Sequence, residues 1–64
     1  MLMQHAATIE FVDGDSKDDA CIIVRYDKST VGLAISLKTN GDLAVFMTKD
    51  DAKQLIEALK TAIL

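Results

Sequence analysis

Residues 31–41 read VGLAISLKTNG, and this stretch decides the fold of the 64-residue chain. From Val31 to Leu37 every second residue is large and apolar, and the residues between are small or polar. This is the two-residue period of a strand with one buried face. The sequence TNG at 39–41 is then typical of a hairpin turn. The stretch predicts a strand over 31–38 that turns back into a partner strand over 42–47.

The length of the turn sets the register of this hairpin. A two-residue loop at Asn40 and Gly41 would divide the large apolar side chains of the two strands between opposite faces. A three-residue loop over 39–41, with Gly41 in the left-handed conformation of a bulge, keeps them on one face. We therefore predict the three-residue loop. The pairs in that register are Leu37 with Leu43, Ile35 with Val45, and Leu33 with Met47.

Two further strands precede the hairpin. Residues 6–12 alternate between apolar and polar side chains, and residues 20–26 are rich in β-branched ones. A two-residue loop at 28–29 pairs Tyr26 with Val31 and aligns the apolar side chains of the second and third strands. Ile9 and Phe11 of the first strand join the same face.

After residue 48 the apolar period becomes that of a helix. Thr48 and Asp51 form a variant of the capping box that starts helices. We predict an amphipathic helix over 49–63. Its apolar stripe consists of Ala52, Leu55, Ile56, Leu59, Ala62 and Ile63. The chain, residues 1–64, is then one α+β domain: a four-stranded antiparallel meander (ββββα) with the C-terminal helix packed on one face.

The face of the sheet opposite the helix carries an unexpected apolar patch. An open face of an antiparallel sheet is usually polar, and a contiguous apolar cluster with charges around it is typical of an interface. We interpret the patch as a candidate interaction surface. Its residues are Cys21, Ile23, Ala34, Ala44 and Phe46, with Arg25 and Lys38 at its edge.

The small size of the chain also indicates association. A domain of about 60 residues buries only about 60% of its unfolded surface, and a single cysteine excludes an internal disulfide. The helix stripe, extended by Ala58 and Leu64, exceeds what one small sheet can cover. We therefore expect a homodimer, formed through the sheet patch or through the helix; the sequence leaves both routes open.

The charge of the chain disfavours several classes of partner. Ten acidic and seven basic residues give a net charge of −3, whereas proteins that bind nucleic acid through phosphates need a basic patch. No apolar stretch approaches the roughly 18–20 residues that span a bilayer. The first residues, MLMQH, lack the features of a signal peptide, and Cys21 has no disulfide partner. We expect a cytoplasmic protein that does not bind membranes, and the charge of the chain disfavours nucleic acid as a partner.

Residues that could carry chemistry are few and isolated. Cys21 falls in the middle of a predicted strand, and His5 falls in a terminus that we expect to be frayed, with no nucleophile assigned near it. The loop over 13–19 holds four aspartates, but their spacing does not match a calcium-binding loop. We predict no enzyme and no cofactor, and whether this loop binds a cation stays open.

The order ββββα resembles that of the small dimeric coactivator domains that bind single-stranded DNA. The resemblance is one of architecture and rests on a generic strand at 32–37 (GLAISL) and helix start at 48–55 (TKDDAKQL). It implies a dimer made by the helices and a nucleic-acid site on the sheet. That family presents basic and aromatic residues there, whereas this chain offers only Arg25 and Lys38.

Three functions are consistent with these observations. The first is a small non-enzymatic protein-interaction or accessory module that acts as a homodimer and binds an unidentified protein. The alternatives are a weak single-stranded nucleic-acid-binding regulator of the ββββα dimer type and a small acidic inhibitor protein of phage or bacterial type.

Overall fold

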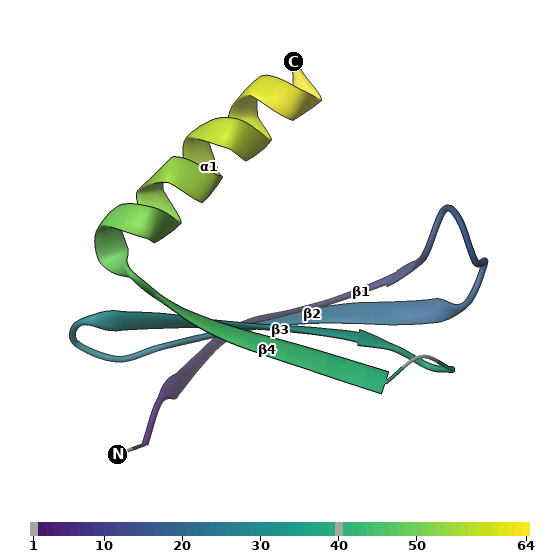
Figure 1. The fold of residues 1–64 in the computed structure, drawn as a ribbon, viewed down its shortest axis with the longest axis horizontal. Helices are drawn as coiled ribbons and strands as arrows, with labels where there is room; N and C mark the ends of the chain where they lie inside the picture. Colours follow the sequence, from purple (N-terminus) through teal and green to yellow (C-terminus); the bar gives the residue numbers. More distant parts are fainter. Residues whose placement is uncertain (1, 40) are drawn as a thin grey trace.

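The computed structural model describes residues 2–39 and 41–64, and it contains one sheet and one helix (Figure 1). The elements are β1 (Gln4–Val12), β2 (Asp19–Tyr26), β3 (Thr30–Leu37), β4 (Gly41–Thr48) and α1 (Lys49–Ile63). The strands are antiparallel and lie in the order β1-β2-β3-β4. The predicted ββββα fold is confirmed. Asn40 of the predicted turn lies outside the described residues.

Strand β1 is longer than predicted because it contains a bulge. His5 and Ala7 pair with successive residues of β2, so Ala6 is an extra residue in β1. Beyond the bulge, pairing continues to Gln4 at the start of the strand. There the Tyr26 hydroxyl donates a hydrogen bond to Gln4 Oε1 at 2.9 Å. The predicted frayed terminus at His5 is therefore wrong, since His5 belongs to the sheet.

The β2–β3 hairpin has the predicted register, with Tyr26 opposite Val31. The turn is held by Asp27, whose Oδ1 accepts hydrogen bonds from the backbone N–H groups of Ser29 at 3.0 Å and Thr30 at 2.9 Å. An aspartate that binds the backbone two and three residues ahead is a common way to stabilise a tight turn. The polar break in the sequence thus has a defined structural role.

The β3–β4 hairpin has the predicted face but not the predicted register. Leu37 lies opposite Gly41, and Ile35 lies opposite Leu43. The predicted pairing of Leu37 with Leu43 is therefore wrong by two residues, as are the two pairs that followed from it. Strand side chains alternate with period two, so a shift by two residues leaves every side chain on its original face. Burial of one face cannot distinguish these two registers.

Two local features accompany the observed register. Ser36 lies opposite Asp42, and Ser36 Oγ donates a hydrogen bond to Asp42 Oδ1 at 2.6 Å. Gly41 has φ of +82°, the left-handed conformation that was predicted for it. The prediction of a left-handed glycine at the end of the turn is confirmed.

Helix α1 begins directly after β4, without a connecting residue. Thr48 caps it as predicted, since its Oγ1 accepts a hydrogen bond from the backbone N–H of Asp51 at 3.1 Å. The helix contacts β3 and β4, and the Lys49 ammonium lies 5.6 Å from the centre of the Tyr26 ring. Figure 1 shows that α1 then rises away from the sheet towards its C-terminus. The helix therefore covers only part of the face towards which it turns.

We call the face of the sheet that turns towards α1 the inner face and the opposite one the outer face. Their members follow from the strand register. The inner face consists of Gln4, Ala7, Ile9, Phe11, Ala20, Ile22, Val24, Tyr26, Val31, Leu33, Ile35, Leu37, Gly41, Leu43, Val45 and Met47. The outer face consists of His5, Thr8, Glu10, Val12, Asp19, Cys21, Ile23, Arg25, Thr30, Gly32, Ala34, Ser36, Asp42, Ala44, Phe46 and Thr48.

Candidate interaction surfaces

The outer face brings the predicted interaction residues together. Ile23 of β2 pairs with Ala34 of β3, which pairs with Ala44 of β4, so three apolar side chains form one row across the sheet. The next row runs from His5 through Arg25 and Gly32 to Phe46. Phe46 is 69% exposed. The predicted patch therefore exists as a contiguous surface with a prominent aromatic side chain.

Gly32 lies under the aromatic ring of this patch. A Cβ added at Gly32 would meet the Phe46 ring at 3.2 Å and the Met3 Cε atom at 3.5 Å. Gly32 is buried, so Met3 and Phe46 together cover it. No sequence pattern indicates that Met3 lies at this end of the outer face, because the face on which it lies depends on the bulge in β1.

His5 belongs to the same face. It pairs with Arg25 of β2, and its Nε2 lies 2.7 Å from Thr8 Oγ1. The hydrogen bond to a neighbouring threonine occupies one ring nitrogen. The arrangement places a histidine beside a cation and a hydroxyl, with Cys21 further along β2 opposite Glu10. His5 and Cys21 therefore lie in different rows of the sheet.

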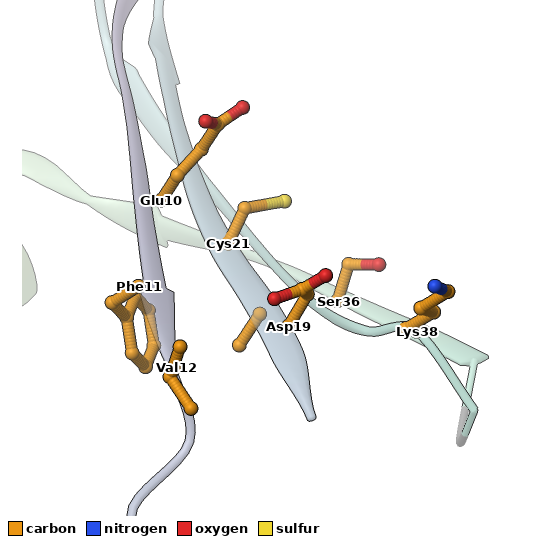
Figure 2. Close-up of a pocket in the computed structure, with 8 residues that line it drawn as sticks. Glu10, Phe11, Val12, Asp19, Cys21, Ser36 and Lys38 are labelled. Atoms are coloured by element: carbon orange, nitrogen blue, oxygen red, sulfur yellow. The ribbon is translucent and has the colours of Figure 1, made fainter. Parts of the chain in front are cut away.

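The other end of the outer face is hollowed. Figure 2 shows side chains of β1, β2 and β3 along an open hollow of about 580 Å³ that is lined by both polar and apolar residues. Cys21 lies in its middle, between Glu10 and Ser36 of the adjacent strands. The residues that line it are Glu10, Phe11, Val12, Asp19, Ala20, Cys21, Ser36 and Lys38. Lys38 thus lies at this hollow and is separated from the apolar row of Ile23, Ala34 and Ala44 by the row of Cys21 and Ser36.

In the acidic loop between β1 and β2, some of the carboxylates accept hydrogen bonds from the loop itself. Asp13 Oδ2 accepts hydrogen bonds from Ser16 N at 2.8 Å and from Ser16 Oγ at 2.7 Å. These two bonds favour the charged form and lower the pKa of the Asp13 carboxyl below its usual 3.8. Thr39 Oγ1 donates to Asp18 Oδ2 and so links the loop to the β3–β4 turn. Within residues 2–39 and 41–64, no group of three His, Cys, Asp or Glu residues could hold a metal ion.

The inner face is a second candidate surface, which the sequence interpretation treated as core. Several of its largest side chains are open to solvent, with exposed fractions from 42% at Ile35 to 65% at Leu43. Ile9, Phe11 and Val45 lie within this range. Across the part of the chain that the structure describes, only Ala20 and Gly32 are buried.

The apolar stripe of α1 is open as well. Its exposed fractions rise along the helix from 38% at Leu55, through 51% at Ile56 and 55% at Leu59, to 82% at Ile63. The predicted cover of the inner face by these side chains is therefore incomplete. Figure 1 shows that the axis of α1 diverges from the sheet towards the C-terminal end of the helix. We use the term inner wedge for the exposed inner face and the exposed stripe of α1 together.

The overall dimensions agree with an open shape. The accessible surface is 5171 Å², whereas a compact monomer of this mass exposes about 4,000 Å². The radius of gyration is 12.8 Å, compared with about 10.7 Å for a compact chain of this length. A single copy therefore exposes about 1,100 Å² more than a compact domain of the same mass.

Comparisons with protein-family models, with curated proteins and with solved structures found no match to this chain. In the residues that the structure describes, no helix has the length and apolar character needed to cross a membrane.

Proposed function

We propose that the chain is a small non-enzymatic protein-interaction module that acts as a homodimer. One observation carries the proposal: the chain exposes 5171 Å² instead of the roughly 4,000 Å² of a compact monomer. The surplus comes with large apolar side chains on the inner face and on α1. Burial of apolar surface is the main driving force of association. A second chain that covers this surface would complete the core.

The amount of surplus surface fits a stable dimer. Two chains that each bury about 1,100 Å² remove roughly 2,200 Å² from water, and obligate homodimer interfaces start at about 2,000 Å². Below about 70–80 residues, oligomerisation is one of the few ways to stabilise a domain that has no disulfide or metal. We therefore propose that the dimer is the folded unit of this protein.

The outer face supports the second half of the proposal, the binding of another protein. If the inner faces are covered in the dimer, the patch of Ile23, Ala34, Ala44 and Phe46 stays on the outside in two copies. Arg25 lies in the row of Phe46, and Glu10 and Asp42 lie in the row of Cys21. Mixed charges around an apolar patch suit a protein partner better than a nucleic acid. The free thiol of Cys21 is compatible with a reducing cytoplasm, which we propose as the location.

Measurement of mass in solution tests the homodimer. Sedimentation equilibrium from low micromolar to millimolar concentration is expected to give about 14 kDa, twice the 7.0 kDa of one chain. A mass of one chain throughout this range would contradict the proposal. A mobility-shift assay with single-stranded DNA at low salt, where phosphate contacts are strongest, is expected to show no shift. A shift would favour the nucleic-acid-binding alternative instead.

A further inference from the structure

We infer that the inner wedge of each chain holds helix α1 of a second copy of the same chain. The two helices are exchanged about a twofold axis, so that each packs on the inner face of its partner. The inference rests on the proposed homodimer and adds where the two chains meet. It assigns the dimer interface to the inner wedge, and not to the outer patch or to the free side of the helix.

The chain cannot easily close the wedge with its own helix. Strand β4 ends at Thr48 and α1 begins at Lys49, so no connecting residue is available to turn the helix back across the sheet. Thr48 is extended, with φ of −72° and ψ of 164°, and it also caps the helix through its bond from Asp51 N. The torsion angles of Thr48, together with the cap, set the direction in which α1 leaves β4. The open angle is therefore built into the junction between β4 and α1.

The dimensions of the helix match those of the face it would cover. Helix α1 has 15 residues and is about 22 Å long at 1.5 Å per residue. Strands β2, β3 and β4 each have eight residues and are about 26 Å long at roughly 3.3 Å per residue. One helix of this length can run along most of the inner face. In a single chain, α1 contacts β3 and β4 and leaves the rest of the inner face uncovered.

The surface chemistry favours a second copy over a different protein. The chain exposes both an apolar sheet face and an apolar helix stripe. Each of these surfaces can be buried against the other. A twofold arrangement uses both surfaces of both chains at once. The opposite side of α1 carries Lys53, Glu57 and Lys60, and Lys60 pairs with Glu57 at 3.3 Å. These charges stay in water when the stripe is buried.

Isotope-filtered NMR of the unmodified protein tests the arrangement. The dimer is refolded from equal parts of ¹³C-labelled and unlabelled chain. The isotope filter then selects only NOEs between a labelled and an unlabelled chain. We expect intermolecular NOEs from the methyl groups of Leu59 and Ile63 to those of Ile9, Ile35 or Leu43. Leu59 and Ile63 probe the stripe of α1, whereas Ile9, Ile35 and Leu43 probe β1, β3 and β4 on the inner face.

Each outcome of the experiment has a distinct meaning. A monomer by sedimentation would contradict the homodimer and, with it, the exchange of helices. A dimer whose intermolecular NOEs arise from Ile23 or Phe46 would overturn the exchange and leave the homodimer intact, with the outer face as the interface. A dimer in which Leu59 and Ile63 contact the inner face only within one chain, or contact only the partner's helix, would also overturn it.

Discussion

Ile35 of β3 lies directly opposite Leu43 of β4 on the inner face, and both side chains are largely open to solvent, at 42% and 65%. In a closed two-layer domain, a pair at this place lies beneath the helix. Here helix α1 contacts β3 and β4 but leaves this pair exposed. The solvent exposure of this pair in solution therefore shows directly whether the inner face is covered.

Substitution of Leu43 should separate the two candidate interfaces. We expect Leu43→Asp to dissociate the dimer, because burying a leucine contributes about 1.5–3 kcal/mol and the symmetric interface buries two copies of it. The dissociation constant should rise by at least about a hundredfold. The measurement is sedimentation equilibrium of the variant and the wild type at matched concentrations.

Phe46→Asp is the matched control, since Phe46 lies on the same strand with nearly the same exposure, 69% against 65%, but on the outer face. It should leave the dissociation constant within about threefold of the wild type. Dissociation by Phe46→Asp with no effect of Leu43→Asp would assign the interface to the outer face.

Helix α1 offers an independent pair of variants. Leu59 lies in the apolar stripe, and Thr61 lies on the opposite side of the helix. We expect Leu59→Lys to weaken the dimer at least tenfold, because the stripe is buried only in the dimer and a lysine cannot be desolvated there at low cost. The measurement is the concentration dependence of mass.

Thr61→Lys introduces the same side chain in the same turn and, like Leu59→Lys, places a cation near the helix C-terminus, which suits the helix dipole. It should leave the dimer unchanged. Equal effects of the two variants would show that the added charge, and not the loss of the stripe, is responsible.

The order of elements and their faces could be predicted because they are local properties. Alternation from Val31 to Leu37 and the cap at Thr48 each depend on a few neighbouring residues. The β3–β4 register could not be predicted, because a slip by two residues preserves the faces. The choice between those registers depends on turn geometry and on pairs such as Ser36 with Asp42.

The position of the helix was harder to predict for a different reason. The apolar stripe of α1 matches the inner face in character, so the sequence indicates that they pack together. It does not say whether they do so within one chain. The direct junction of Thr48 and Lys49 bears on this. The sequence predicts that junction, but the direction in which the helix leaves the sheet is visible only in the structure. The shared face of the outer patch, by contrast, followed from alternation, whereas its neighbours across β3 and β4 and the position of Lys38 beside the hollow did not.

Gly41 should be the glycine of the turns that tolerates substitution least. Its φ of +82° is a conformation that residues with a Cβ adopt only at a cost of about 1–2 kcal/mol. We expect Gly41→Ala to lower the free energy of unfolding by this amount. Urea unfolding at a fixed protein concentration measures it, because the stability of a dimer depends on concentration.

Gly14→Ala is the control for this variant. A Cβ at Gly14 would meet no atom within 4 Å, and Gly14 does not have a positive φ. Alanine at such a place restricts the unfolded chain, so the variant should be neutral or more stable by up to about 1 kcal/mol. An equal loss at both positions would contradict the assignment of strain to Gly41.

The β1–β2 loop should respond to acid through Asp13. The backbone N–H and the hydroxyl of Ser16 lower the pKa of Asp13 in the folded state below 3.8. A carboxyl with a lowered folded-state pKa stabilises the fold above its unfolded pKa, and this contribution is lost as the pH falls through the folded value. The stability difference between wild type and Asp13→Asn should therefore stay constant at neutral pH and shrink below pH 3.8.

NMR titration of the Asp13 carboxyl carbon gives the pKa directly. Ser16→Ala should raise this pKa only part of the way to 3.8, because it removes the hydroxyl but leaves the backbone N–H, which is the larger cause. A pKa of 3.8 or above in the wild type would show that these bonds are not maintained in solution.

The cap of α1 should matter more than an average helix cap, since its bond also fixes the junction that holds the inner wedge open. Thr48→Ala removes the acceptor for Asp51 N and should cost about 1 kcal/mol of stability. Because the variant loosens the junction, it should also let α1 fold back onto its own sheet and so raise the monomer fraction. Thr48→Ser retains the hydroxyl and should preserve both stability and dimer. Urea unfolding and sedimentation of the three proteins distinguish the two effects. A Thr48→Ala protein that loses stability with no change in its dissociation constant would show that the junction does not control how the two chains meet.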